Sequence, residues 1–131
     1  MNPRNQLLMQ LRGDALGIIY KLSSAEERFQ NETLRPILKL QNDLLIQIFI
    51  NYCIKQKSTF FKLNVNKKLE YIEQNIQRDM KFRDFLKGII IAFFTLEEFE
   101  NYSKNASNLN KRIITMLIER LQSQVQLIVI P

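Results

Sequence analysis

A chain of 131 residues has the size of one ordinary domain and is long enough to bury a hydrophobic core. Its 46% hydrophobic and 24% charged residues are typical of globular proteins and exclude the disordered and fibrous classes. Histidine is absent, which excludes every catalytic or metal site that depends on an imidazole.

The residue pattern predicts one all-α domain over residues 1–131, a bundle of about five to six helices. Glycine and proline number only three each, too few for the many tight turns of a sheet fold. The first helix is predicted from Pro3 to Leu22. Its expected apolar face is formed by Leu7, Leu8, Leu11, Leu16, Ile19 and Tyr20.

A long central helix is predicted next. Ser24 followed by Glu27 is the pattern of a capping box and marks its start. Two interpretations stay open: one helix to about Lys57 that bends at Pro36, or one that stops near Thr33 and a second that begins at Pro36. We favour the single bent helix, because no glycine or polar cluster marks a loop.

The remaining helices follow a connection that contains Ser58, Thr59 and Asn64. We expect helices from Lys67 to about Arg78 with Asn66 as N-cap, from Met80 to Phe94 with Asp79 as N-cap, a short one capped by Thr95 and Glu98, and a long one from near Ser107. The expected core positions of these helices are Leu69, Ile72, Ile76, Phe82, Phe85, Leu86, Ile89, Ile90, Phe93, Leu109, Ile113, Leu117, Leu121, Val125 and Ile128.

The stretch from Leu44 to Ile54, LLIQIFINYCI, is the most apolar of the chain. It is shorter than the about 20 residues that span a bilayer, so we expect no membrane span. Only Gln47 and Asn51 interrupt it. They belong to a row of polar residues spaced four apart, which drifts around the helix by about 40° per step: Arg35, Lys39, Asp43, Gln47, Asn51 and Lys55. A helix that is apolar nearly all round must be covered by its own chain or by a second copy.

The C-terminal tail, which contains Leu127, Ile128 and Ile130, is apolar, and this favours cover by a second copy of the chain. A free terminus with this much apolar surface is unusual in a monomer. We therefore expect a homodimer or larger assembly, with Gln47 and Asn51 setting the register across the interface. The residues proposed for self-association are Gln47, Asn51, Leu127, Ile128 and Ile130.

The net charge of +6 and a lysine-rich segment suggest the alternative, nucleic-acid binding. Phe60 and Phe61 lie among the lysines, and aromatic rings among basic groups suit single-stranded nucleic acid. The candidate contacts are Lys55, Lys57, Lys62, Lys67 and Lys68. The last two helices are a second candidate, because their spacing partly follows a helix-turn-helix.

No pattern predicts a catalytic, cofactor-binding or metal site. Cys53 lies in the most apolar stretch, so we expect it to pack as a small hydrophobe in a reducing cytoplasm. The acidic residues that a magnesium site would use lie at helix starts or beside basic residues, where structural roles are expected: Asp79, Asp84, Glu97, Glu98 and Glu100. The sequence thus favours a non-enzymatic module for protein–protein interaction or self-association.

Four stretches resemble a small uncharacterised helical family: LRPILKLQND, RDMKFRDFLKGIII, FTLEEFENY and LNKRIITMLIERLQSQ. They make up about half of the chain. Members of that family sometimes carry the label glyoxalase, which this sequence does not support because the glyoxalase metal site uses histidine. The resemblance implies a helical fold and transfers no functional residue.

Overall fold

The computed structural model, which describes residues 2–13 and 24–131, is an all-α bundle. The described residues form six separate helical runs and no strand. In chain order the elements are α1 (Pro3–Arg12), α2 (Ala25–Phe29), the π-helical turn η1 (Gln30–Leu34), α3 (Arg35–Lys55), the 3-10 turn η2 (Phe60–Lys62), α4 (Val65–Arg78), α5 (Met80–Ile91), α6 (Leu96–Lys104), α7 (Ala106–Ser123) and the 3-10 turn η3 (Val125–Leu127).

The predicted long helix is a single run from α2 through η1 into α3. Its departure from α geometry lies just before Pro36, the residue at which the sequence predicted a bend. Pro36 has no N–H to donate to the carbonyl of Glu32, and its ring crowds that carbonyl. The wider π-helical turn accommodates this proline, and the Arg35 N–H bonds Gln30 O across it.

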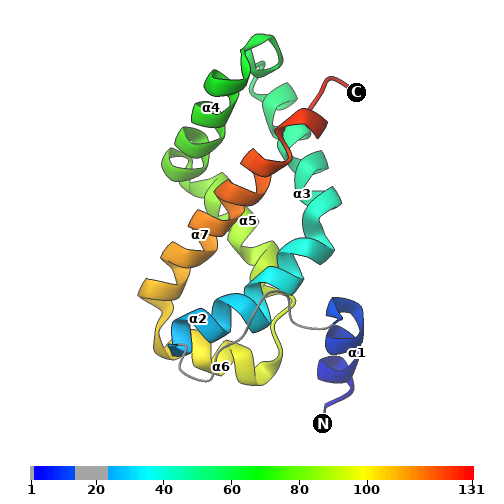
Figure 1. Ribbon diagram of the computed structural model, residues 1–131, viewed down its shortest axis with the longest axis vertical. Coiled ribbons are helices and arrows are strands. Elements are labelled where there is room, and N and C mark those ends of the chain that lie inside the picture. Colours follow the sequence, from blue (N-terminus) through cyan, green and yellow to red (C-terminus); the bar gives the residue numbers. More distant parts are fainter. Residues whose placement is uncertain (1, 14–23) are drawn as a thin grey trace.

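The core lies where α3, α4, α5 and α7 meet. In Figure 1, α3 and α4 flank the upper half, α7 runs diagonally between them and α5 passes behind. Phe49 of α3 is fully buried, and its ring contacts those of Tyr52, Phe60, Tyr71 and Phe82. Burying one aromatic side chain of this kind contributes about 2 to 3 kcal/mol. Because the rings come from α3, α4 and α5, this aromatic group anchors three helices to one another.

Side-chain caps set most helix starts. Ser24 accepts from the Glu27 amide, and Thr95 with Glu98 forms a complete capping box, as predicted. Asp79 caps α5 by accepting from the Phe82 amide. The predicted cap Asn66 is wrong: Asn64 accepts from the Lys67 amide at 2.9 Å, and α4 begins two residues earlier.

Three expectations on burial and length need correction. Leu7 and Leu11 are 61% and 60% exposed, because α1 lies at the edge of the bundle and buries only the row of Leu8 and Arg12. Phe85, at the margin of the α5 stripe, is 52% exposed. Helix α5 ends at Ile91 rather than at the predicted Phe94, because the chain after Ile91 tightens into i to i+3 hydrogen bonds. The predicted part of the first helix beyond Gly13 lies outside the described residues.

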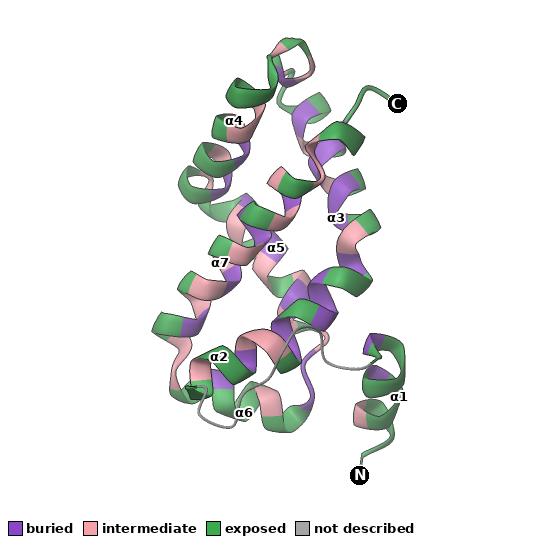
Figure 2. Cartoon of the chain, viewed as in Figure 1, coloured by how far each residue is buried: buried purple, intermediate pink, exposed green. Residues whose placement is uncertain are grey.

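No helix in the described ranges is long and apolar enough to cross a membrane. The N-terminal helix α1 and the C-terminal tail lie toward opposite ends of the molecule (Figure 1). Figure 2 shows that α3 keeps exposed residues along its length, between buried ones.

Candidate functional site

A buried ion pair joins α1 to α6 at the base of the bundle. Arg12, in the last turn of α1, contacts Glu98 of α6 through both guanidinium nitrogens: Nη1 to Oε1 at 2.6 Å and Nη2 to Oε2 at 2.9 Å. The side chains are 1% and 17% exposed. Thr33 donates its hydroxyl to Glu98 Oε2 at 2.6 Å, and the Thr95 amide donates to Oε1 at 2.8 Å.

Local sequence places each partner. Glu98 is the third residue of the capping box that Thr95 opens, and Thr33 lies in the π-helical turn. The Glu32 carbonyl, which Pro36 cannot bond, accepts from Arg12 Nη2 at 3.0 Å. Arginine suits this position because its planar fork donates to several acceptors at once.

The Glu98 carboxylate of this ion pair is fully hydrogen-bonded rather than reactive. Burial alone raises the pKa of Glu98, but the hydrogen bonds from Arg12, Thr33 and Thr95 outweigh it and hold the pKa below the ordinary value of 4.5. Glu98 is therefore an ionised, fully bonded carboxylate, unsuited to take or give a proton near neutral pH. We assign this network a structural role. Its only orphaned group is Arg12 Nε, which is buried with no partner.

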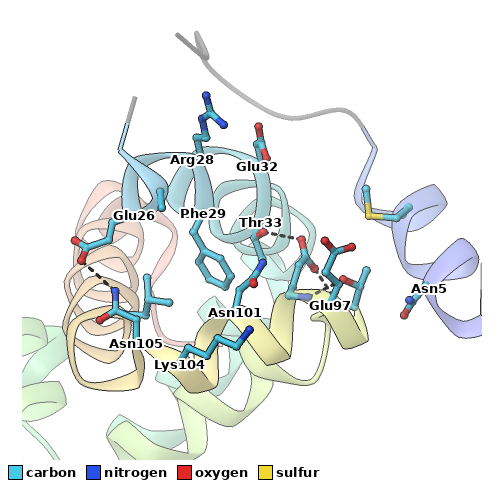
Figure 3. Close-up of a pocket in the computed structure, with 15 residues that line it drawn as sticks. Asn5, Glu26, Arg28, Phe29, Glu32, Thr33, Glu97, Asn101, Lys104 and Asn105 are labelled. Atoms are coloured by element: carbon cyan, nitrogen blue, oxygen red, sulfur yellow. Dashed lines mark hydrogen bonds between the residues drawn. The ribbon is translucent and has the colours of Figure 1, made fainter. Parts of the chain in front are cut away.

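Beside the network lies a pocket of about 580 Å³ between α1, α2 and α6 (Figure 3). Its apolar lining comes from Met9, Ala25, Phe29 and Leu109, and the remaining lining residues are polar or charged. The pocket opens to the surface.

Two charged residues that line this pocket, Glu26 and Lys104, are paired with other side chains, whereas Glu32 and Glu97 line it as exposed carboxylates. Glu26 accepts from Asn105 at 3.1 Å and forms an ion pair with Arg112 at 3.2 Å, and Figure 3 shows the first of these contacts. The hydrogen bonds from Asn105 and Arg112 hold the pKa of Glu26 below its usual range. Lys104 pairs with Glu100 at 3.3 Å. Groups that already neutralise one another offer little binding energy to a charged ligand.

The acidic residues weighed for a magnesium site serve the fold instead. Asp79 caps α5 and accepts from the Tyr52 hydroxyl at 2.8 Å, which lowers the pKa of Asp79. Asp84 lies 3.6 Å from Lys87. Across the described ranges, no group of three or more acidic or cysteine side chains converges on a point where a metal ion would bind.

The five candidate lysines gather where α3 ends and α4 begins, at the top of Figure 1. Lys55, Lys57 and Lys62 are exposed. Phe60, however, is fully buried, and Lys68 lies over its ring at 5.5 Å from the centroid. Lys67 pairs with Glu70 at 3.5 Å. A buried ring cannot stack on a base, so of the two phenylalanines only the half-buried Phe61 retains any access to solvent.

The helix-turn-helix pattern does not match the geometry of α6 and α7. The two helices are separated by one residue, Asn105, rather than by the turn of three to four residues that defines the compact motif. The Tyr102 hydroxyl bonds Asn110 at 2.5 Å and holds the two helices together.

The residues proposed for self-association separate into two groups. Gln47 and Asn51 are exposed on α3, and Leu127 and Ile130 are 51% and 69% exposed. Ile128 is fully buried in the core of its own chain and contributes nothing to the surface. The whole predicted polar row of α3 is exposed, so it marks the side of the helix that the bundle leaves open.

The same side of α3 also exposes apolar residues that the sequence did not single out. Leu40, Leu44 and Ile54 are 38%, 49% and 49% exposed, whereas Leu45, Phe49 and Cys53 are fully buried. We call this surface the α3 stripe. It comprises Leu40, Asp43, Leu44, Gln47, Asn51, Ile54 and Lys55. The signal was present in the sequence, because Leu44 and Ile54 directly adjoin residues of the polar row.

Comparison with known proteins gives no further guidance, because no family model, curated protein or solved structure matches the chain.

Proposed function

We propose that this protein works by association rather than by catalysis, as a helical module that binds a second copy of itself through the α3 stripe. One observation carries the proposal. The longest helix of the bundle leaves one face open along its length, and on that face half-exposed leucine and isoleucine alternate with polar side chains. Protein interaction surfaces combine apolar and polar groups in this way.

The chain's chemistry supports the same conclusion. The best-built polar cluster, around Arg12 and Glu98, is saturated by internal hydrogen bonds. Cys53 is fully buried, and burial raises the pKa of its thiol to about 12, which removes it as a nucleophile.

Light scattering during size exclusion tests the proposal. We expect the mass of the wild-type protein to exceed 15.6 kDa at tens of micromolar and to fall toward that value on dilution. Leu44→Glu places a charge in the α3 stripe and is expected to abolish the larger species. Val65→Glu is the matched control, because Val65 is 60% exposed on α4, outside the stripe.

A strict monomer at tens of micromolar would overturn the proposal. If the Leu44→Glu variant still forms the larger species, the association does not use the α3 stripe. Circular dichroism of both variants verifies that they fold, which we expect since both positions are exposed.

Nucleic-acid binding is the second candidate, favoured by the gathering of Lys55, Lys57 and Lys62 at one end of the molecule. Binding driven by phosphate contacts weakens steeply as salt rises. A gel shift with generic single-stranded DNA or RNA at low salt, lost at high salt, would support this candidate. No shift at low salt would remove it.

A further inference from the structure

We infer that residues 55–68 form a docking surface for an anionic lipid bilayer, with lysines that contact the lipid phosphates and aliphatic side chains that enter the boundary between headgroups and acyl chains. We call this segment the basic end. It joins α3 to α4 and forms the top of the molecule in Figure 1, remote from α1 and α6. The inference goes beyond self-association and does not depend on it.

The basic end carries five lysines and no acidic residue. The sequence contains no aspartate or glutamate anywhere between Asp43 and Glu70. Lys55, Lys57 and Lys62 are exposed, and they take part in none of the ion pairs found in residues 2–13 and 24–131. A cluster of four to eight basic residues is typical of surfaces that bind anionic lipid, and each lysine strengthens such binding about fivefold.

The other two lysines have partners within the chain. Lys67 lies 3.5 Å from Glu70, and Lys68 lies over the ring of Phe60. The pair of Lys67 and Glu70 is exposed, and exposed ion pairs contribute little free energy. Lys67 therefore remains able to contact a lipid phosphate.

Lys57 occupies a backbone conformation that favours glycine. Its φ is +50°, in the left-handed region. It ends α3 in a Schellman motif, in which the Ser58 N–H donates to Cys53 O and the Lys57 N–H donates to Ile54 O, both at 3.0 Å. Glycine is the usual residue at this position, because a Cβ is unfavourable there. A lysine at a position where the fold itself prefers glycine points to a role outside the fold.

Exposed aliphatic side chains at the same end favour lipid over nucleic acid. Val65, the first residue of α4, is exposed, and Leu63 is partly exposed. Aliphatic groups gain free energy at the boundary of a bilayer but do not stack on bases. Of the two phenylalanines, Phe60 is fully buried, and the segment has no arginine to hold one phosphate by two hydrogen bonds.

Sedimentation with lipid vesicles tests the inference. At low salt we expect the full chain to sediment with vesicles of equal parts phosphatidylcholine and phosphatidylserine, and to stay in solution with vesicles of phosphatidylcholine alone. Binding should weaken as salt rises, because salt screens the attraction between lysines and lipid. No binding to the phosphatidylserine vesicles at low salt would overturn the inference.

The double variant Lys57→Gln/Lys62→Gln should weaken vesicle binding about 25-fold, since each lysine contributes about fivefold. Lys39→Gln/Lys111→Gln is the matched control, because it removes the same charge from exposed positions on α3 and α7 outside the basic end. Equal weakening by the two double variants would show that only net charge matters and would overturn the basic end as the docking surface.

Lys57→Gly separates binding from folding. Glycine fits the left-handed backbone at this position, so the variant should melt at the wild-type temperature or above it. It should nevertheless bind the phosphatidylserine vesicles about fivefold more weakly. Binding as tight as that of the wild type would overturn the role of Lys57.

Val65→Ser tests the apolar contact and should weaken vesicle binding about fivefold. Leu96→Ser is the matched control, because Leu96 is likewise the exposed first residue of a helix, α6, at the opposite end of the molecule. Unchanged binding of Val65→Ser would overturn the entry of this side chain into the bilayer.

Single-stranded RNA is the competing ligand for the same lysines. Val65→Ser should leave any binding of RNA unchanged, because a base makes no use of an aliphatic contact. A gel shift with RNA at low salt, without binding to the phosphatidylserine vesicles, would assign the basic end to nucleic acid and overturn the inference.

Discussion

Single residues far apart in the sequence connect α1 to the rest of the bundle. The pair of Arg12 and Glu98 spans 86 positions and is almost wholly removed from water. Removing two charges from water costs several kcal/mol, and only close geometry and further hydrogen bonds offset this cost. Thr33 and Thr95 supply those bonds to the carboxylate. The network is therefore stable when complete and costly to break at any one member.

Glu98→Gln should destabilise the protein by about 3 kcal/mol near neutral pH, because it leaves Arg12 buried without its counter-charge. Glu98→Gln should also change how the free energy of unfolding depends on pH. The folded pKa of Glu98 lies below its ordinary value of 4.5, so the unfolded chain binds the proton first as pH falls. The stabilisation is thus present above pH 4.5 and is lost as pH falls through the folded pKa.

Urea unfolding at a series of pH values measures this effect. In the acid range we expect the free energy of unfolding to depend less steeply on pH for Glu98→Gln than for the wild type. Glu97→Gln, at an exposed neighbouring position, is the control and should follow the wild type. Equal slopes for Glu98→Gln and the wild type would contradict the assigned role.

Cys53 should be unreactive in the folded protein. Its side chain is fully buried, and burial raises the pKa of the thiol to about 12, so almost no thiolate exists near neutral pH. A thiol reagent such as DTNB should modify Cys53 only as fast as the protein unfolds, and completely in denaturant. Rapid modification of the folded protein would show that this part of the core is accessible.

At the level of elements, the sequence predicts helix starts better than helix faces. Ser24, Asp79 and Thr95 cap helices as expected, because a cap is a contact between residues three apart and is visible locally. Asn64 and Asn66 carry the same signal, and the sequence does not distinguish them. The exposure of Leu7 depends on which neighbour lies beside α1, and no local pattern contains that information.

Helix α1 is attached by a few polar contacts to the segment between the end of α5 and the start of α6. Arg4 donates to the carbonyls of Ala92 and Phe94 at 2.7 and 2.8 Å, and the Leu96 amide donates to Asn5. Cationic groups at a helix C-terminus satisfy its free carbonyls and interact favourably with its dipole. Since α1 buries little apolar surface, these polar contacts carry much of its attachment.

Arg4→Ala should therefore loosen α1 without unfolding the bundle. We expect hydrogen exchange of the α1 amides to accelerate about tenfold, with exchange in α4 and α7 unchanged. Gln10→Ala is the control, because Gln10 is exposed on the same helix. Unchanged exchange in α1 would show that Arg12 and Leu8 hold it alone, and equal acceleration throughout would show that α1 unfolds together with the core.

At the level of the whole molecule, the bundle covers most of its most apolar helix but not all of it. The sequence predicted Gln47 and Asn51 at an interface between copies, and within the single chain the bundle leaves both exposed. It did not single out Leu44 and Ile54, which stay half exposed. It gave Ile128 both as a core position and as a self-association residue, and the fold buries Ile128 fully. How much of α3 and of the tail is covered depends on how α7 and the tail pack on α3, which is a property of the assembled fold.

The half-exposed leucine and isoleucine of the α3 stripe make the central claim testable at the level of atoms. In a mixture of isotope-labelled and unlabelled protein at a concentration that favours the dimer, filtered NMR experiments detect only contacts between copies. The account predicts nuclear Overhauser effects between copies that involve the methyl groups of Leu44 or Ile54, which are half exposed on the α3 stripe. No contact between copies at α3 would contradict it.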